Sequence, residues 1–328
     1  MSLAISKAWE YQVLTAPNPA VGACVVSPCG KILSVEAHKR AGFPHAEVEA
    51  LKSAYIQLTS DTTIASLTSS QDIHTYLLEH HNGCFIGCEI YTTLEPCAHY
   101  GKTPSCASLI TSLGLSKVYI GASDFNNEAA GGAVMLKENG IEVEEGILSQ
   151  KCDDLLLPFR HYLQRNFVFF KWAQRLDGST NDGAISSSAS KELVHKMRDV
   201  CDLLVIGGNT VRVDRPTLDA RVVSGKAPDI LIYSREKEFD PSIPLFSVPD
   251  RKVYIEDSLE RIKEYRCVMI EGSERMFEAT KDYTHLYLAF IAPKFAPSNG
   301  FGSVRADFRI LSERKVGDDI MAWMKLEE

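Results

Sequence analysis

The sequence has no apolar run of about 18 residues and no run of lysines and arginines. A transmembrane helix needs about 20 consecutive apolar residues, so none is expected, and neither is a membrane partner. Proteins that bind nucleic acid usually carry a basic patch, whereas this chain has a net charge of −8. We therefore expect no nucleic-acid partner. An enzyme that acts on a small molecule is the better expectation.

Further absences narrow the class. The first residues lack the charged and then apolar layout of a secretory signal, which predicts a cytoplasmic protein. Thiols stay reduced in that compartment, so the nine cysteines are expected to be metal ligands or core residues and not disulfides. The second half of the chain contains neither Gly-x-Gly-x-x-Gly nor Gly-Lys-Ser/Thr, so it has no Rossmann fingerprint and no phosphate-binding P-loop.

The length of 328 residues predicts two domains of roughly 150 residues each. We expect a first domain at 1–148, a helical connector at 149–166 and a second domain at 167–328. Residues 57–83, which are rich in serine and threonine, are predicted to be a surface insertion with one weak helix at 71–80. Apolar patterns in the rest of the first domain predict helices over 1–15, from His45 onward and over 107–113, and strands over 23–26, 32–35, 88–94, 117–121 and 141–143.

Strands alternate with helices in the second half, which indicates a mixed or parallel sheet with helices on its faces. Two strands there are followed by glycine and an expected helix start, at Gly207-Gly208 and at Gly272. Backbone amides at such a turn can hold phosphate, although turn formation alone explains the glycines at least as well. The expected strands are 167–173, 203–206, 230–233, 252–255, 267–270 and 286–292, and the expected helices are 190–200 and 274–280.

A metal site is indicated by His45-Ala46-Glu47, Pro96-Cys97 and Cys106. One histidine and two cysteine thiolates can hold Zn²⁺ and leave a fourth position for water, whose pKa the metal lowers from about 15.7 towards about 7. Glu47 is then not a ligand, and it carries a proton from the water to the departing amine. This combination is the signature of zinc-dependent deaminases.

Other interpretations account for parts of this pattern. The cysteines alone could be buried thiols, and a purely structural zinc site would need a fourth protein ligand and would give Glu47 no role. A deaminase of tRNA or single-stranded nucleic acid is disfavoured by the acidic charge and by the eight residues between Cys97 and Cys106. The insertion offers further histidines, which are interpreted as solvated residues and not as ligands: His74, His80 and His81.

Taken together, these residues resemble one family, the bifunctional deaminase–reductase of bacterial riboflavin biosynthesis. The first half matches at Ala16-Pro17-Asn18-Pro19-x-Val21-Gly22, His45-Ala46-Glu47 and Thr93-Leu94-Glu95-Pro96-Cys97-x-His99-x-Gly101-Lys102-Thr103-Pro104-x-Cys106. The second half matches at Lys171-x-Ala173-x-x-Leu176-Asp177-Gly178, Thr210-Val211-x-x-Asp214-x-Pro216-x-Leu218-x-x-Arg221 and Ile270-Glu271-Gly272. The resemblance implies two α/β domains: a cytidine-deaminase-like three-layer α/β/α domain, and then a dihydrofolate-reductase-like domain.

The resemblance also implies two consecutive reactions on a phosphorylated pyrimidine. The first is zinc-dependent hydrolytic deamination of 2,5-diamino-6-(5-phosphoribosylamino)pyrimidin-4(3H)-one, and the second is reduction of its ribosyl group to ribityl by NADPH. In the first domain, one Zn²⁺ would be held by His45, Cys97 and Cys106, with Glu47 as the catalytic residue. The pyrimidine substrate would be bound by Asn18, His99 and Lys102.

For the second domain the resemblance implies a cofactor site formed by Ala173, Thr210, Asp214 and Gly272. Substrate contacts would come from Arg198, Leu218, Arg221 and Glu271, the two guanidinium groups matching phosphate oxygens. Ala184 stands where the family commonly has tryptophan, and Ser273 where it has a second glycine. The alternative is therefore a deaminase with a degenerate, non-reducing second domain. Members of this family are often homo-oligomers.

Overall fold

The computed structural model describes the chain except for residues 100–103, 126–130, 181–182, 297–303 and 328. Contacts divide it into two compact units, Met1–Leu157 and Pro158–Glu328. The division falls within helix α6 (Ser149–Gln164), so this helix contributes to both units. Among the described residues, no helix is long and apolar enough to cross a membrane.

The first unit is built on a five-stranded sheet with the order β2-β1-β3-β4-β5. Strand β1 pairs antiparallel with both β2 and β3, whereas β3, β4 and β5 are parallel. The carboxyl ends of the parallel strands therefore lie at one edge of the sheet, where α/β proteins usually bind their ligands. The strands are β1 (Gly22–Val26), β2 (Ile32–Ala37), β3 (Glu89–Leu94), β4 (Lys117–Ala122) and β5 (Glu142–Glu145).

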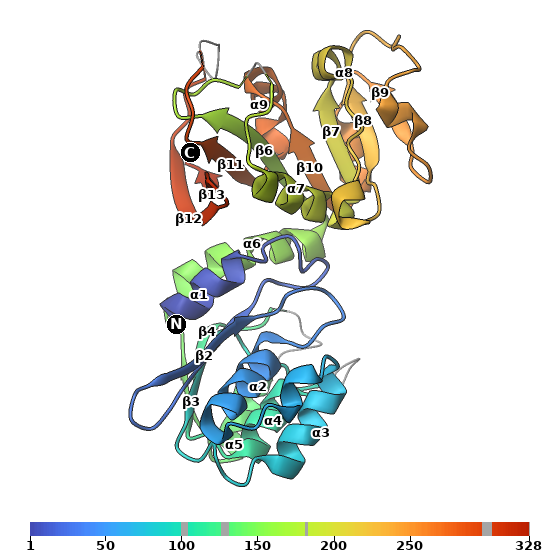
Figure 1. The fold of residues 1–328 in the computed structure, drawn as a ribbon. Helices are drawn as coiled ribbons and strands as arrows, with labels where there is room; N and C mark the ends of the chain where they lie inside the picture. The colour runs from blue at the N-terminus through green and yellow to red at the C-terminus, as the bar shows by residue number, and fades with distance from the viewer. Residues whose placement is uncertain (100–103, 126–130, 181–182, 297–303, 328) are drawn as a thin grey trace. The chain divides into compact units, whose positions relative to one another are not determined.

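Helices cover both faces of this sheet, which confirms the three-layer arrangement (Figure 1). Helix α1 (Ser2–Trp9) and the start of α6 lie on one face. A side chain on Gly22 would place its Cβ only 2.0 Å from the carbonyl oxygen of Ala4, so glycine lets α1 pack directly on β1. On the other face lie α2 (Ala46–Thr59), α3 (Ser70–His80), α4 (Cys106–Leu113) and α5 (Gly132–Glu138).

The insertion is more ordered and more buried than the sequence suggests. Helix α2 continues into it as far as Thr59, and α3 begins after Ser69, whose hydroxyl accepts a hydrogen bond from the backbone N–H of Asp72. The expectation that His74 is solvated is wrong, because this side chain is only 4% exposed. One stripe of α3 is turned inward and consists of Ser70, Ile73, His74 and Leu77.

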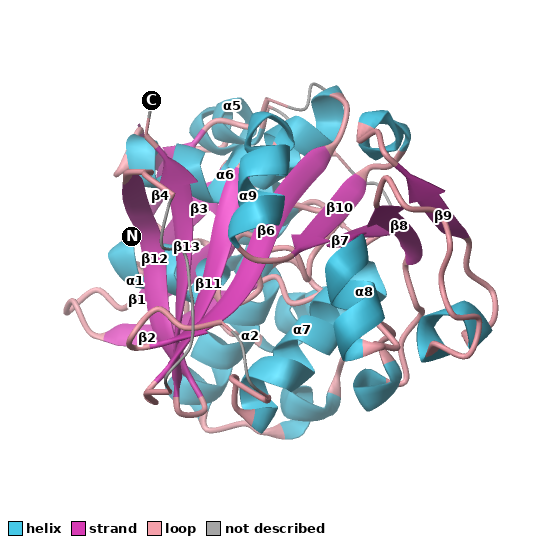
Figure 2. Cartoon of the chain, turned by 90° about the horizontal axis from the view of Figure 1, so that it is seen from above, coloured by secondary structure: helices cyan, strands magenta, loops and turns pink. Residues whose placement is uncertain are grey.

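The second unit contains an eight-stranded sheet with the order β12-β13-β11-β6-β10-β7-β8-β9 (Figure 2). Strands β6 to β11 are mutually parallel, and β13 and β12 close one side as antiparallel strands. The central strands are buried on both faces, which explains their continuous apolar runs. The strands are β6 (Phe167–Arg175), β7 (Leu203–Gly207), β8 (Asp229–Tyr233), β9 (Val253–Glu256), β10 (Cys267–Glu271), β11 (Leu286–Ala292), β12 (Phe308–Val316) and β13 (Asp319–Leu326).

Register places the ends of three central strands together. Glu271 at the end of β10 pairs with Lys171 of β6 and with Ile206 of β7. Chain segments that leave these strands therefore enclose one region beyond the sheet edge. The helices of this unit are α7 (Ser188–Val200), α8 (Gly208–Asp214) and α9 (Glu274–Thr280), and both α8 and α9 begin just after a strand end.

Candidate active sites

His45 and Glu47 lie at the start of α2. His45 is the N-cap residue with extended backbone angles, φ −66° and ψ 161°, and Pro44 precedes it. Glu47 falls in the first helical turn, where a negative charge is stabilised by the helix dipole, and its side chain is buried. The short spacing between them means that the helix start fixes both side chains at once.

Cys97 and Cys106 meet because β3 and α4 converge. Cys97 follows β3 by three residues, and Cys106 is the first residue of α4. The Ser105 hydroxyl donates to the carbonyl oxygen of Cys97 at 2.9 Å, and the backbone N–H of Cys106 donates to Cys97 Sγ at 3.4 Å. These bonds hold the two sulfur atoms side by side.

The three donor atoms have the separations that a tetrahedral zinc site requires. His45 Nδ1 lies 3.8 Å from Cys97 Sγ and 3.4 Å from Cys106 Sγ, and all three atoms lie within 4.8 Å of one another. Zn–S bonds of about 2.3 Å and Zn–N bonds of about 2.0 Å at tetrahedral angles place S and N about 3.5 Å apart. The set fits Zn²⁺ with one position left open. It is the only such donor cluster within the part of the chain that the structure describes.

Glu47 has the electrostatics of a proton carrier. Burial raises the pKa of its carboxyl group to about 7. A group with a pKa near the working pH is the most effective at both taking and returning a proton. In the metal-free chain the two thiols differ, because the hydrogen bond from Cys106 lowers the pKa of Cys97 to about 4 and raises that of Cys106 well above its ordinary value.

Glu95 stabilises the segment that precedes Cys97, a role that its sequence context does not indicate. Its carboxylate accepts hydrogen bonds from the backbone N–H groups of Asp124, Gly131 and Ala133 at 2.9–3.1 Å. These bonds tie the segment before Cys97 to the segment that leads into α5. No local sequence pattern reveals this role, because all three partners are backbone atoms.

The predicted pyrimidine-binding residues have different outcomes. Asn18 is half-buried, and its Nδ2 lies 3.1 Å from Nε2 of His38. His99 is exposed and lies two residues after Cys97. Lys102 lies outside the described residues. His38, which no sequence motif indicated, is buried, and its ring meets that of His45 edge-on with centroids 5.7 Å apart.

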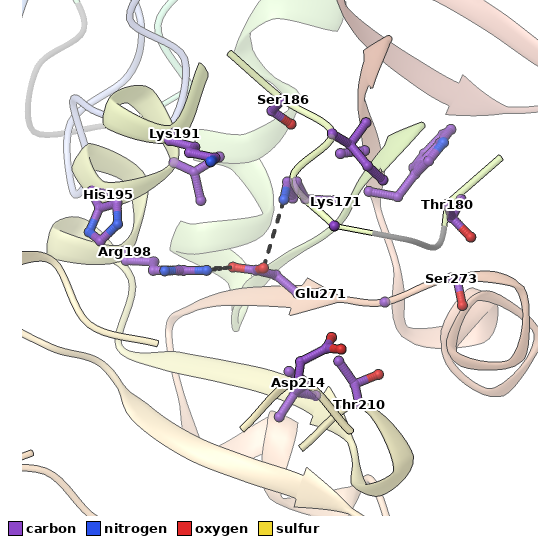
Figure 3. A pocket seen from close by; sticks show the side chains of 17 residues that line it. Lys171, Thr180, Ser186, Lys191, His195, Arg198, Thr210, Asp214, Glu271 and Ser273 are labelled. Atoms are coloured by element: carbon purple, nitrogen blue, oxygen red, sulfur yellow. Dashed lines mark hydrogen bonds and ion pairs between the residues drawn. The ribbon is translucent and has the colours of Figure 1, made fainter. Parts of the chain in front are cut away.

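A cavity of about 370 Å³ lies at the carboxyl ends of β6, β7 and β10 in the second unit (Figure 3). Its size is within the range of small-molecule pockets. Six of the eight residues predicted for the reductase site line it: Ala173, Arg198, Thr210, Asp214, Glu271 and Gly272. Other lining residues were not assigned a role from the sequence, among them Lys171, Trp172, Lys191 and His195.

Three charged side chains at this cavity form a buried cluster. Glu271 Oε1 accepts from Nε and Nη2 of Arg198 at 2.9 and 2.7 Å, and Glu271 Oε2 lies 3.7 Å from the Lys171 ammonium (Figure 3). All three side chains are between 12% and 14% exposed. Burial lowers the pKa of Lys171. One carboxylate between two cations leaves one unit of positive charge, which suits a phosphorylated ligand.

Leu218 and Arg221 are not among the residues that line the cavity. Leu218 is buried in a neighbouring core cluster with a positive φ of 56°, and its carbonyl oxygen accepts from Arg251. Arg221 has a side chain that is 63% exposed and pairs with Asp219 at 3.1 Å. The loop is nevertheless linked to the cavity, because Arg198 Nη1 donates to the carbonyl oxygen of Asp219 at 3.4 Å.

Lys191, His195 and Arg198 share one face of α7. Their spacing of four and three residues is the helical repeat, and all three line the cavity. This spacing is visible in the sequence and could have indicated a basic helix face. The sequence alone does not show which strand ends this helix face lies against, because that depends on the order of the strands in the sheet.

Family comparisons agree with both sites. Residues 1–122 match the cytidine and deoxycytidylate deaminase zinc-binding region, and residues 166–281 match the RibD C-terminal domain. Fold and sites therefore define a zinc-dependent deaminase unit joined to a reductase unit that uses NADPH. The chain belongs to the family of the riboflavin biosynthesis protein RibD. Its role is bifunctional, and a non-reducing second domain is not favoured.

Individual relatives match most of this chain. The protein of this name from Actinobacillus pleuropneumoniae is 31% identical over 285 residues, covering 83% of this chain and 68% of that protein. The one from Aquifex aeolicus is 28% identical and covers 99% and 97%. Among solved structures, a diaminohydroxyphosphoribosylaminopyrimidine deaminase/5-amino-6-(5-phosphoribosylamino)uracil reductase from Thermotoga maritima has a TM-score of 0.66 at 26% identity, covering 100% of this chain and 97% of that one.

Proposed function

We propose that the chain deaminates 2,5-diamino-6-(5-phosphoribosylamino)pyrimidin-4(3H)-one and then reduces the ribosyl group of the product to ribityl with NADPH. The observation that carries this proposal is the presence of both sites in one chain. A His-Cys-Cys donor set with zinc spacing lies beside a buried glutamate, and a cation-rich cavity lies at the strand ends of the second unit. The name of the Thermotoga maritima relative contains the same two activities.

In the deamination, Zn²⁺ held by His45, Cys97 and Cys106 supplies the Lewis acidity that makes water nucleophilic at neutral pH. Glu47 accepts a proton from the attacking water and returns it to the amino group, which leaves as ammonia. The raised pKa of Glu47 suits both transfers. Asn18 and His99 hydrogen-bond the pyrimidine edge. Lys102 pairs with the phosphate as a point charge.

In the reduction, NADPH supplies the hydride, so the protein has to align the cofactor with the ribose carbon. Ala173, Thr210, Asp214 and Gly272 border the cofactor. Opening of the ribose ring requires a proton on the ring oxygen, and Lys171 is a buried ammonium at the cavity with a lowered pKa.

The substrate phosphate is recognised by the basic helix face and the neighbouring loop. Arg198 and Arg221 bind the phosphate, and Leu218 and Glu271 border the substrate.

The functional division of the chain is a deaminase domain at 1–148, a helical connector at 149–166 and a reductase domain at 167–328. It differs from the division by contacts at Leu157/Pro158 because α6 packs in both units.

The test is to incubate the purified protein with the diaminopyrimidine, with and without NADPH, and to measure ammonia and NADPH oxidation. Both should change, and NADPH should be consumed only after deamination. Arg221→Ala should raise the KM for the phosphorylated intermediate about tenfold while the KM for NADPH stays within about twofold. Lys196→Ala, which removes an exposed lysine of α7 paired with Glu192, is the matched control. Ammonia without NADPH oxidation contradicts the bifunctional assignment.

A further inference from the structure

Asn18 is held by a buried histidine that the deamination chemistry described above does not use. His38 follows β2 directly and is 3% exposed. Its Nδ1 lies 3.0 Å from the carbonyl oxygen of Pro44, and its Nε2 lies 3.1 Å from Nδ2 of Asn18. The imidazole ring therefore bridges the turn before the metal ligand His45 and the side chain of Asn18.

The polarity of this bridge is determined by the carbonyl group of Pro44. A carbonyl oxygen can only accept, so Nδ1 of His38 must carry a hydrogen. A buried ring with no carboxylate bonded to it is neutral and has one N–H, which leaves Nε2 as an acceptor. Asn18 must then present its NH₂ group to His38, and its carbonyl oxygen Oδ1 faces the other way. Which end of an amide is nitrogen is set by such a network.

The backbone of Asn18 is fixed by two hydrogen bonds. Its N–H donates to the carbonyl oxygen of Thr15 at 2.9 Å, and the Thr15 hydroxyl donates to the carbonyl oxygen of Asn18 at 3.0 Å. Within the described parts of the chain, no hydrogen bond to Oδ1 is formed. This oxygen is thus an acceptor that is available to a ligand.

We propose that His38 is a positioning residue that fixes the amide of Asn18 with its oxygen towards the substrate and thereby selects a pyrimidine with an N–H donor at that edge. This inference rests on the proposed function. A pyrimidin-4(3H)-one has a ring N–H beside the carbon that loses its amino group. Cytosine has no ring N–H beside the carbon that carries its amino group. An acceptor oxygen there favours the first ring, and a site built to bond an N–H discriminates strongly against a ligand that lacks it.

The test uses the full-length protein with the substitutions His38→Leu, Asn18→Ala and both together. His38→Leu should raise the KM for the diaminopyrimidine about tenfold, since one oriented hydrogen bond is lost, with a smaller change in kcat. The double variant should be no worse than Asn18→Ala, because His38 acts through Asn18. His38→Gln should restore most of the affinity, since glutamine can donate to Pro44 and accept from Asn18. Additive losses, or an unchanged KM in His38→Leu, would overturn the proposal.

Two further measurements separate this inference from the proposed function. Zinc content and NADPH oxidation with the deaminated pyrimidine should equal those of the wild type in every variant, and loss of zinc in His38→Leu would indicate support of His45 instead. ¹⁵N NMR of histidine-labelled wild-type protein, assigned by comparison with His38→Gln, should show His38 protonated at Nδ1. Protonation at Nε2 overturns the inference whether or not deamination is observed. If the wild type releases no ammonia but shows the Nδ1–H form, the proposed function fails and the amide orientation stands.

Discussion

The charge cluster at the reductase cavity predicts a large loss of stability for one substitution and almost none for another at a neighbouring residue. Glu271→Gln removes the one carboxylate and leaves Lys171 and Arg198 without a counter-charge. Lys171→Met removes the surplus cation and leaves Arg198 and Glu271 as a hydrogen-bonded pair. Both changes nearly preserve side-chain volume, so packing contributes little to the difference.

The magnitudes follow from the distances. At an effective dielectric constant of about 20, unit charges 3.7 Å apart, the separation of Lys171 and Glu271, attract by about 4.5 kcal/mol. The Arg198 pair, at 2.7 Å, is stronger. Removing one partner of a buried pair costs about 3–5 kcal/mol, which we expect for Glu271→Gln. In Lys171→Met the lost attraction is offset by relief of lysine desolvation and of repulsion from Arg198, so the stability should change by less than about 1 kcal/mol.

Urea unfolding followed by tryptophan fluorescence can measure this difference in the second unit. The chain has three tryptophans, and in a Trp9→Phe background the remaining two, Trp172 and Trp323, both lie in that unit. Both substitutions should abolish NADPH oxidation and leave ammonia release intact. If Lys171→Met destabilises the unit as much as Glu271→Gln does, the surplus positive charge is not the controlling quantity and the electrostatic reasoning is wrong.

Three other outcomes are expected. Glu47→Gln should keep its zinc by metal analysis but lose deamination by about 10²–10⁴-fold, and retained turnover would remove Glu47 from proton transfer. Chelation of zinc should stop ammonia release while NADPH oxidation with the deaminated pyrimidine continues. His285 accepts a hydrogen bond from Val168, and burial lowers its pKa from 6.5 to about 4. The unfolded chain therefore binds a proton between these values that the folded chain does not. The stability of the second unit should be complete above pH 6.5 and fall by up to about 3 kcal/mol as the pH approaches 4, and His285→Gln should flatten this slope.

The zinc site could be predicted because its residues are tied to local structure. His45 and Glu47 are two residues apart at a helix start, and Cys97 and Cys106 lie at a strand end and a helix start. The start of a helix and the end of a strand can both be predicted from local sequence. Only the contact between the segment with His45 and the segment with the two cysteines had to be assumed. The same applies to the strand ends that carry Lys171 and Glu271 in the second unit.

Elements with weak local signals were missed or misjudged. Strand β12 lies at an edge of the sheet, where charged side chains are common. Its charged and apolar residues do not alternate regularly, so the sequence lacks the period of two that indicates a strand. Its partner β13 was missed with it. In the insertion, the serines and threonines suggested solvent exposure. The buried stripe of α3 shows instead that tertiary packing, not composition, decides where His74 lies.

The roles of Glu95 and His38 could not be predicted from the sequence, and both cases have the same physical reason. Each is a buried polar group that is bonded to the backbone: Glu95 to three N–H groups, and His38 to the Pro44 carbonyl. Every residue except proline offers the same N–H, so the sequence carries no record of which one is bonded. Residues that perform the chemistry can thus be inferred from their type and spacing. Residues that orient them are found only when the backbone is known. The backbone carbonyl of Pro44 sets the tautomer of His38, and His38 in turn sets the orientation of the Asn18 amide.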